Sequence, residues 1–111
     1  MAGDEPMTSD NGLQAPEALR VLAESLERAL DANQSVLMMR HAPEVCTVYL
    51  GDPSGPQEEL RRVGSISTVL ANEMLSLTSS GTNRIQIGDQ LYRFVRSFTQ
   101  VGEKAAVVFS V

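Results

Sequence analysis

The sequence contains no tryptophan and few other aromatic residues, with three phenylalanines and two tyrosines among its 111 residues. Its core must therefore be built from aliphatic side chains and methionine, and the hydrophobic fraction of 42% is enough for one ordinary globular domain. The longest apolar run, Ala105–Phe109, is far shorter than the ~20 residues that a membrane-spanning helix needs. We expect neither a membrane span nor a second domain.

Cysteine and histidine are each present only once, as Cys46 and His41. A single cysteine excludes an intrachain disulfide and any zinc site with two or more thiolates. The acidic start of the chain, Met1–Pro6, lacks the basic and apolar segments of a secretory signal. We therefore predict a cytoplasmic protein that holds no metal and no cofactor.

A pair formed by Cys46 and His41 is the one catalytic arrangement that the composition suggests. The two residues lie five positions apart, and a tight hairpin could bring the imidazole to the thiol and activate it as a nucleophile. However, Cys46 lies in an alternating apolar segment, where a free cysteine usually behaves as a small buried hydrophobic residue. We therefore predict no catalytic residue.

Negative charge predominates, with fourteen acidic residues against nine basic ones and a pI of about 4.7. Residues 1–59 carry eleven acidic residues and three arginines, whereas residues 60–111 carry three acidic residues, five arginines and one lysine. This balance argues against a nucleic-acid binder, because neutralising phosphates requires clustered Lys and Arg. The uneven distribution could instead steer a protein partner or pair two copies head to tail.

The chain is expected to begin with a disordered acidic tail over residues 1–12, followed by a single α+β domain over residues 13–111. Residues 16–32 predict a helix, because Pro16 suits the first helical position and regularly spaced leucines form one apolar stripe. These leucines are Leu19, Leu22, Leu26 and Leu30.

Two strands joined by a turn are predicted next. Val45–Leu50 is rich in β-branched and aromatic residues, and residues 36–40 form a short apolar run that Ala42 and Pro43 end. The turn is expected around His41–Glu44. A helix over residues 36–40 is the alternative.

The clearest loop covers residues 51–56, which include two glycines and two prolines. It lacks the Gly-Lys-Ser/Thr ending of a phosphate-binding loop, so we assign it no nucleotide. Residues 57–79 then predict a second helix with the apolar stripe Leu60, Val63, Leu70, Met74 and Leu77. Gly64 weakens the middle of this helix, so in an alternative interpretation it begins near Ser67 and residues 58–63 are extended.

Residues 83–111 predict three strands in an antiparallel meander, with turns at Gly88-Asp89 and at residues 101–104. The last strand, Ala105–Val111, is apolar on both faces, which is typical of a strand in the middle of a sheet. The predicted fold is therefore an antiparallel sheet of about five strands with two helices packed on it.

The order helix, strand, strand, helix and three strands resembles the Roadblock/dynein light chain family and, more loosely, profilin and PAS-type sensor domains. The resemblance rests on the order of Glu17–Ala32, Val36–Leu50, Leu60–Leu77 and Arg84–Val111 and on no specific motif. It implies a homodimer built from sheet edges and second helices, which would serve as a platform for small GTPases or motor complexes.

Two candidate surfaces follow from these patterns. The helical stripe Leu60, Val63, Leu70 and Met74 is the candidate interface between two copies. The candidate ligand pocket lies between sheet and helices and is lined by Tyr92, Phe94 and Arg96, since interleaved arginines and aromatic rings can hold an anion or a base. The simpler interpretation is an aromatic core face with Arg93 in solvent.

We therefore expect a non-catalytic protein-interaction or regulatory module that self-associates as a homodimer and also binds an unidentified protein. The alternative is a domain that senses a small molecule or an anion in the predicted pocket. Neither nucleic acid nor a membrane is an expected partner.

Overall fold

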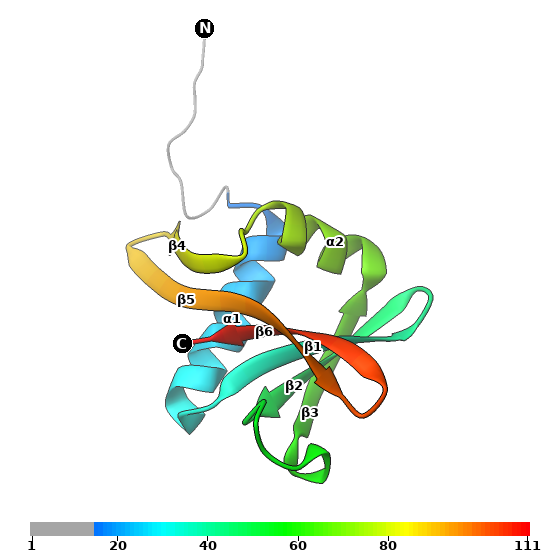
Figure 1. Cartoon of the computed structure of the whole chain (residues 1–111). Helices are drawn as coiled ribbons and strands as arrows, with labels where there is room; N and C mark the ends of the chain where they lie inside the picture. The colour runs from blue at the N-terminus through cyan, green and yellow to red at the C-terminus, as the bar shows by residue number, and fades with distance from the viewer. Residues whose placement is uncertain (1–14) are drawn as a thin grey trace, which may run out of the picture.

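The structure is a computed structural model that describes residues 15–111, so the predicted tail over residues 1–12 lies outside the described part. Helices, strands and one short 3-10 helix follow one another along the chain (Figure 1). In chain order they are α1 (Glu17–Ala32), β1 (Ser35–Ala42), β2 (Val45–Gly51), η3 (Gln57–Glu59), β3 (Arg61–Ser67), α2 (Thr68–Ser76), β4 (Gly81–Ile87), β5 (Gln90–Val101) and β6 (Lys104–Ser110). Within the described range, no helix combines the length and the apolar character that crossing a membrane requires.

All six strands form one antiparallel sheet in the order β3-β2-β1-β6-β5-β4. The predicted α+β class is confirmed, but the sheet has six strands where the sequence predicted about five. The last strand, β6, lies in the middle of the sheet between β1 and β5, as its apolar faces predicted. The outermost strands are β3 and β4.

The helix α1 confirms the prediction from the leucine stripe and begins at Glu17, directly after Pro16. Leu22 and Leu26 are buried against the sheet, whereas Leu30 is 57% exposed and does not belong to the buried stripe. The helix ends at Asn33, which adopts a left-handed conformation (φ 55°) and donates its N–H to the last carbonyls.

The predicted helix over residues 57–79 is wrong in its first half, and the alternative with a later start is confirmed. Residues 61–67 form β3, and α2 begins after Ser67, whose Oγ accepts a hydrogen bond from the Leu70 N–H at 3.0 Å. The error has a physical cause. A bulge at Val63, where the register of β3 with β2 shifts, puts Val63 and Ile66 on the same face of the strand, so their spacing imitates one turn of a helix.

Tight turns connect the remaining strands. Gly88 and Gly102 occupy the first turn positions after β4 and β5 with φ of 65° and 63°, a conformation that favours glycine. The turn between β1 and β2 contains only Pro43 and Glu44, which is shorter than predicted, and a bulge lies beside it between Arg40 and Ala42. Residues 36–40 are a strand and not a helix.

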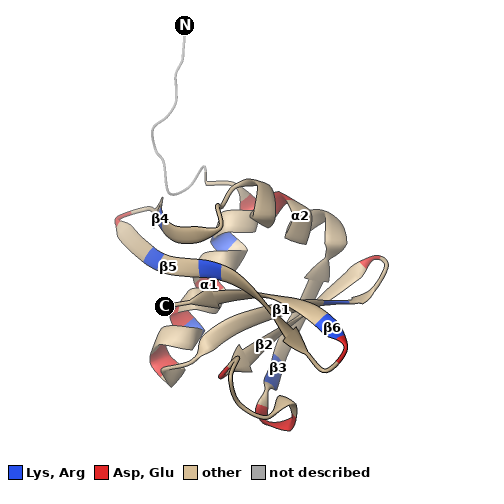
Figure 2. Cartoon of the chain, in the orientation of Figure 1, with Lys and Arg blue, Asp and Glu red and all other residues tan. Residues whose placement is uncertain are grey.

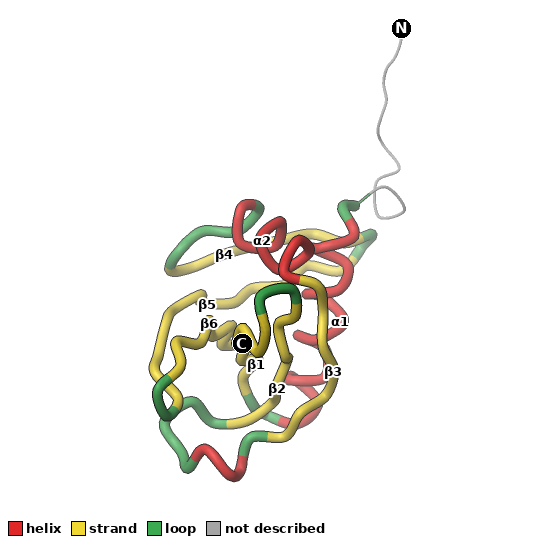
Figure 3. The backbone as a smooth tube through the Cα atoms, turned by 90° about the vertical axis from the view of Figure 1, so that its right-hand side faces the viewer, coloured by secondary structure: helices red, strands yellow, loops and turns green. Residues whose placement is uncertain are grey.

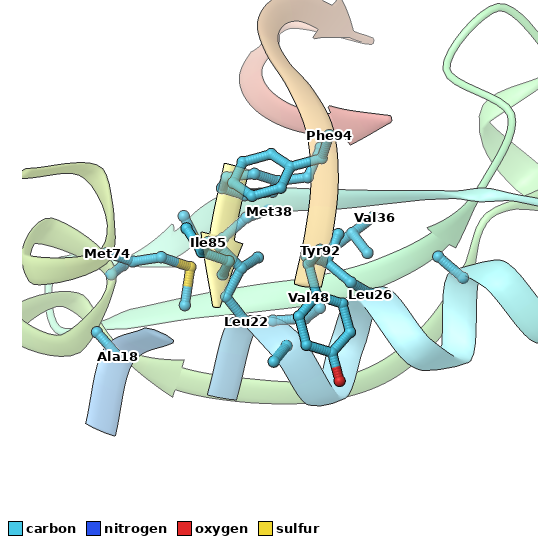
Figure 4. Close-up of a cluster of buried hydrophobic side chains, with 14 of the residues drawn as sticks. Ala18, Leu22, Leu26, Val36, Met38, Val48, Met74, Ile85, Tyr92 and Phe94 are labelled. Carbon is cyan, nitrogen blue, oxygen red and sulfur yellow. The ribbon is translucent and has the colours of Figure 1, made fainter. Parts of the chain in front are cut away.

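Both helices cover one face of the sheet, called here the helix-covered face, and the main hydrophobic core lies between them and the strands. Figure 4 shows side chains from α1, α2 and the strands meeting in this core. Its largest fully buried members are Leu22, Leu26, Val36, Leu50 and Phe109.

The opposite face, called here the open face, has a smaller core and no helix longer than η3. This smaller core consists of Leu37, Met39, Val101, Ala106 and Val108, with Tyr49 and Leu60 packed against it. Figure 3 shows the strands curling into an arc, with the segment that contains η3 at its lower end. The curl and this segment bury the smaller core without help from α1 or α2.

Candidate functional site

The predicted interface stripe does not exist as one surface. Leu60 follows η3 and packs on the open face, while Val63 lies in β3. Met74 is buried in the main core and Leu70 is half-buried against it, both in α2. The four residues therefore do not form one helical stripe, because they belong to three different segments and turn toward the protein interior. Their role as an interface stays a prediction.

The predicted pocket residues do share one face of β5, but the interior of the protein fills the space between them. Phe94 is 2% exposed and packs edge-to-face on Phe109, with 5.7 Å between the ring centroids. The Tyr92 ring is buried in the same core. Arg93, on the other face of the strand, is exposed. This arrangement agrees with the simpler interpretation of an aromatic core face with Arg93 in solvent. The ligand pocket of Tyr92, Phe94 and Arg96 stays a prediction.

Arg96 holds the end of α2. Its Nη1 donates to the Leu75 carbonyl at 2.8 Å and to the carbonyl and Oγ1 of Thr78 at 3.1 and 2.8 Å. The last carbonyls of a helix lack partners within the helix, and a positive charge there is favourable. Arg96 therefore stabilises the fold through Nη1, while its buried Nε has no hydrogen-bond partner within residues 15–111.

Tyr92 joins β5 to α1 at the border of the core. Its hydroxyl points away from the packed side chains (Figure 4) and donates a hydrogen bond to Glu27 Oε2. This hydrogen bond, together with burial of the ring and the negative charge of Glu27, raises the pKa of Tyr92 to about 12. The pair therefore links helix and strand through a protonated tyrosine.

Cys46 and His41 are not brought together. Cys46 is buried in the main core on the helix-covered face, whereas His41 lies with Met39 and Thr47 beside a depression on the open face. Among residues 15–111, no three His, Cys, Asp or Glu side chains are grouped so that they could hold a metal ion.

One of the two edges of the sheet is the outer side of β4. This strand pairs with β5 in one continuous register from Gly81 to Ile87, without a bulge or a proline. The two-residue turn makes Ile87 and Gln90 a hydrogen-bonded pair, and such pairs alternate with non-hydrogen-bonded pairs along an antiparallel ladder. The N–H and C=O groups of the non-hydrogen-bonded residues Thr82, Arg84 and Gln86 therefore point away from β5. No described strand pairs with them.

The other edge, β3, is much less regular. Its register with β2 shifts between Val48 and Tyr49, and it contains Gly64 together with the adjacent exposed arginines Arg61 and Arg62. Bulges and charges on an edge strand are common devices against pairing with another chain. The two edges therefore differ in how well they could accept a further strand.

The side chains next to β4 on the open face combine apolar and positive groups. Leu91 and Val95 of β5 are 44% and 45% exposed. Between them, Arg93 lies directly opposite Arg84 of β4. Figure 2 shows the positive segments along β5, while acidic residues occupy the helices and hairpin turns. Two arginines in direct cross-strand contact repel each other, so this surface favours a partner with acidic or uncharged groups at that position.

The sequence did not single out the β4 edge. The alternation of Ile85 and Ile87 with polar residues predicted a strand, but an edge is defined by strand order, which the sequence pattern does not contain. No protein-family model matches this chain, and no curated protein or solved structure shows significant similarity to it. The resemblance to Roadblock domains therefore stays a prediction.

Proposed function

We propose that this protein is a non-catalytic interaction module whose copies pair through the outer edges of β4. The observation that carries this proposal is the regular register of β4 with β5, together with the outward backbone groups of Thr82, Arg84 and Gln86, which pair with no strand among residues 15–111. Pairing two such edges would join two six-stranded sheets and would satisfy backbone groups that otherwise face water.

The arginines determine how the two strands would align. A symmetric alignment that places Arg84 opposite Arg84 of the partner subunit would put four arginines in one row, because Arg93 already lies beside Arg84. A shift that sets Arg84 opposite Gln86 of the partner subunit separates the charges and keeps the backbone hydrogen bonds. We propose this shifted antiparallel alignment.

The proposal retains the homodimer expected from the sequence but places the interface on the β4 edge instead of the helical stripe. The helical stripe of the sequence interpretation is internal, whereas β4 is available at the end of the sheet. The alternative function, sensing a ligand between Tyr92, Phe94 and Arg96, loses its pocket because the core fills it. A lone buried cysteine suits a reducing compartment, so we propose that the module acts in the cytoplasm, where the dimer would bind a further protein.

Sedimentation equilibrium tests the proposed dimer, from low to high micromolar concentration and at low and high salt. The native chain is expected to dimerise, and more tightly at high salt, because screening weakens the repulsion between arginines. Replacing Arg84 with proline removes an outward N–H while leaving the bonds to β5 intact, and should weaken the dimer at least about tenfold.

Arg84→Ala is the matched control, because it removes the same side chain but keeps the N–H. It should dimerise as well as the native chain or better, since one repulsive charge is gone. A native chain that is monomeric at every concentration would show that the β4 edge does not pair. A dimer that Arg84→Pro leaves intact would place the interface elsewhere.

A further inference from the structure

The open face contains a small polar cavity of about 180 Å³ over the central strands of the sheet. Its walls come from the hairpin of β1 and β2, from η3 and from the start of β6. The residues that line the cavity include Met39, His41, Thr47, Tyr49, Gln57 and Lys104.

The register of the strands explains why these residues meet. Met39 lies opposite both Thr47 of β2 and Ala106 of β6, so the three strands present neighbouring positions on the open face. Lys104 lies two residues before Ala106 and therefore on the same face, next to His41 at the end of β1. The segment that contains Gln57 then closes the cavity from the side, close to Gly102.

The cavity contains polar groups that the fold does not use. Thr47 is 3% exposed, yet it is part of the cavity wall. Within residues 15–111, the side chains of His41, Thr47, Tyr49 and Gln57 take part in none of the side-chain hydrogen bonds. Thr47 Oγ1 is not enclosed, because the buried side-chain atoms that lack a partner in residues 15–111 do not include it. It can therefore bond to water or to a molecule that occupies the cavity.

The charge of the lining indicates what this partner is. Lys104 and Arg40 are basic, and within residues 15–111 no acidic residue lines the cavity. This is unusual in a chain with fourteen acidic residues and nine basic ones. Lysine, two hydroxyls, an imidazole and an amide also supply hydrogen-bond donors from several directions.

We propose that this cavity binds a phosphate group, either as free phosphate or as a small phosphomonoester. A cavity of 180 Å³ is below the ~300 Å³ of typical pockets for larger ligands, which suits a small tetrahedral oxyanion. Donors on several sides match the three-dimensional arrangement of phosphate oxygens better than a planar carboxylate. The site shares no residue with the β4 edge, so phosphate binding can be tested independently of dimer formation.

The test is an NMR titration of the ¹⁵N-labelled full chain with sodium phosphate, at fixed pH and at constant ionic strength maintained with sodium chloride. We expect saturable shifts of the amides of His41, Thr47, Tyr49, Gln57 and Lys104. O-phosphoserine and acetate are titrated in the same way. Binding of the phosphomonoester alone would show that the group is recognised as an ester, whereas binding of free phosphate shows that the group alone suffices.

Three variants decide whether the shifts report the proposed site. Lys104→Met replaces an exposed side chain and should weaken phosphate binding by about tenfold or more. Thr47→Val has almost the same shape without the hydroxyl and should weaken it by roughly three- to tenfold. Arg93→Ala, which removes an exposed positive charge outside the cavity, should leave the affinity within about twofold of the native value.

Several results would overturn the proposal. One is the absence of saturable shifts with both phosphate and O-phosphoserine at concentrations up to tens of millimolar. Another is equal weakening by Lys104→Met and Arg93→Ala, which would reveal general attraction to positive charge. Acetate binding as tight as phosphate binding would show that the cavity does not select phosphate. The native amide spectrum of each variant confirms that it is folded.

Discussion

The two faces of the sheet use their polar residues in opposite ways. On the helix-covered face, Arg96 is bonded to the end of α2 and Tyr92 is bonded to Glu27, so both polar side chains hold the structure together. On the open face, the side chains of Thr47 and His41 take part in no hydrogen bond within residues 15–111 and line a cavity instead. The first face thus uses its polar side chains to connect elements, although the buried Arg96 Nε has no partner among residues 15–111, whereas the second face leaves polar side chains free to contact a ligand.

The two faces can also be compared through their apolar cores, because Leu26 and Leu37 are both fully buried but on different faces. We expect Leu26→Ala to lower the free energy of unfolding by about 3–4 kcal/mol, because α1 and the sheet cannot move close enough together to fill the resulting cavity. Leu37→Ala should cost less, about 2–3 kcal/mol, because the smaller core under η3 can relax. Urea unfolding at neutral pH measures both; a larger loss for Leu37→Ala would reverse our ranking of the two cores.

Replacing Arg96 with alanine should have the next largest effect. The substitution leaves the carbonyls of Leu75 and Thr78 without their donor, so we expect a loss of about 2–3 kcal/mol in unfolding free energy. Arg93→Ala on the opposite face of the same strand should change stability by less than about 0.5 kcal/mol. Similar losses in the two variants would mean that Arg96 does not support α2.

The turn glycines connect stability to the proposed ligand site. Gly88→Ala and Gly102→Ala both force a side chain into a left-handed conformation, and each should cost about 1 kcal/mol by urea unfolding. They differ in their surroundings. A Cβ at Gly102 would lie 2.9 Å from Gln57 Oε1, whereas nothing lies within 4 Å of one at Gly88.

Gly102→Ala should therefore displace the flexible end of Gln57 and weaken phosphate binding by roughly threefold, the effect of one neutral hydrogen bond. Gly88→Ala should leave binding unchanged. If neither glycine affects binding, Gln57 is not a donor in the site, and the ligand is held by β1, β2 and β6 alone.

The smallest expected effect concerns the pair of Tyr92 and Glu27. Because the pKa of Tyr92 in the folded protein, about 12, lies above the ordinary value of about 10, its contribution to stability is complete below pH 10. This contribution is lost as the pH rises from 10 through 12. Since the hydroxyl lies near solvent, we expect no more than about 1 kcal/mol.

Glu27→Gln should lower the pKa of Tyr92 toward 10, because it removes both the charged acceptor and its negative charge. Tyrosinate absorbance against pH measures this, in a Tyr49→Phe background where Tyr92 is the remaining tyrosine. Glu24→Gln, one turn earlier on α1, is the control and should leave the pKa unchanged. An unchanged pKa in Glu27→Gln would mean that burial alone raises it.

The sequence predicted those elements whose local pattern agrees with their tertiary surroundings. Leu22 and Leu26 of α1 and the apolar last strand are examples, since they bury the surface that their pattern indicates, whereas Leu30 does not. The strand β3 was missed as the main prediction because an edge strand shows little hydrophobic alternation, and Val63 and Leu70 have a spacing that also fits a helix.

The candidate sites were harder to predict than the fold. The edge of β4 depends on the order of strands, and the cavity depends on the meeting of Thr47, Gln57 and Lys104 from separate segments. Neither leaves a local motif. Arg96 was noticed for its charge, but the sequence does not show that the end of α2 would occupy its guanidinium.

The central position of β6 also has a consequence for how the chain folds. β1 obtains its second neighbour only from β6, about seventy residues later in the chain, and the two halves of the sheet meet only through this strand. During synthesis, the inner edge of β1 therefore stays without its strand while β2, β3, α2, β4 and β5 are made. We expect this to make folding slow for a domain of this size and to leave the nascent chain exposed to aggregation until β6 has entered the sheet.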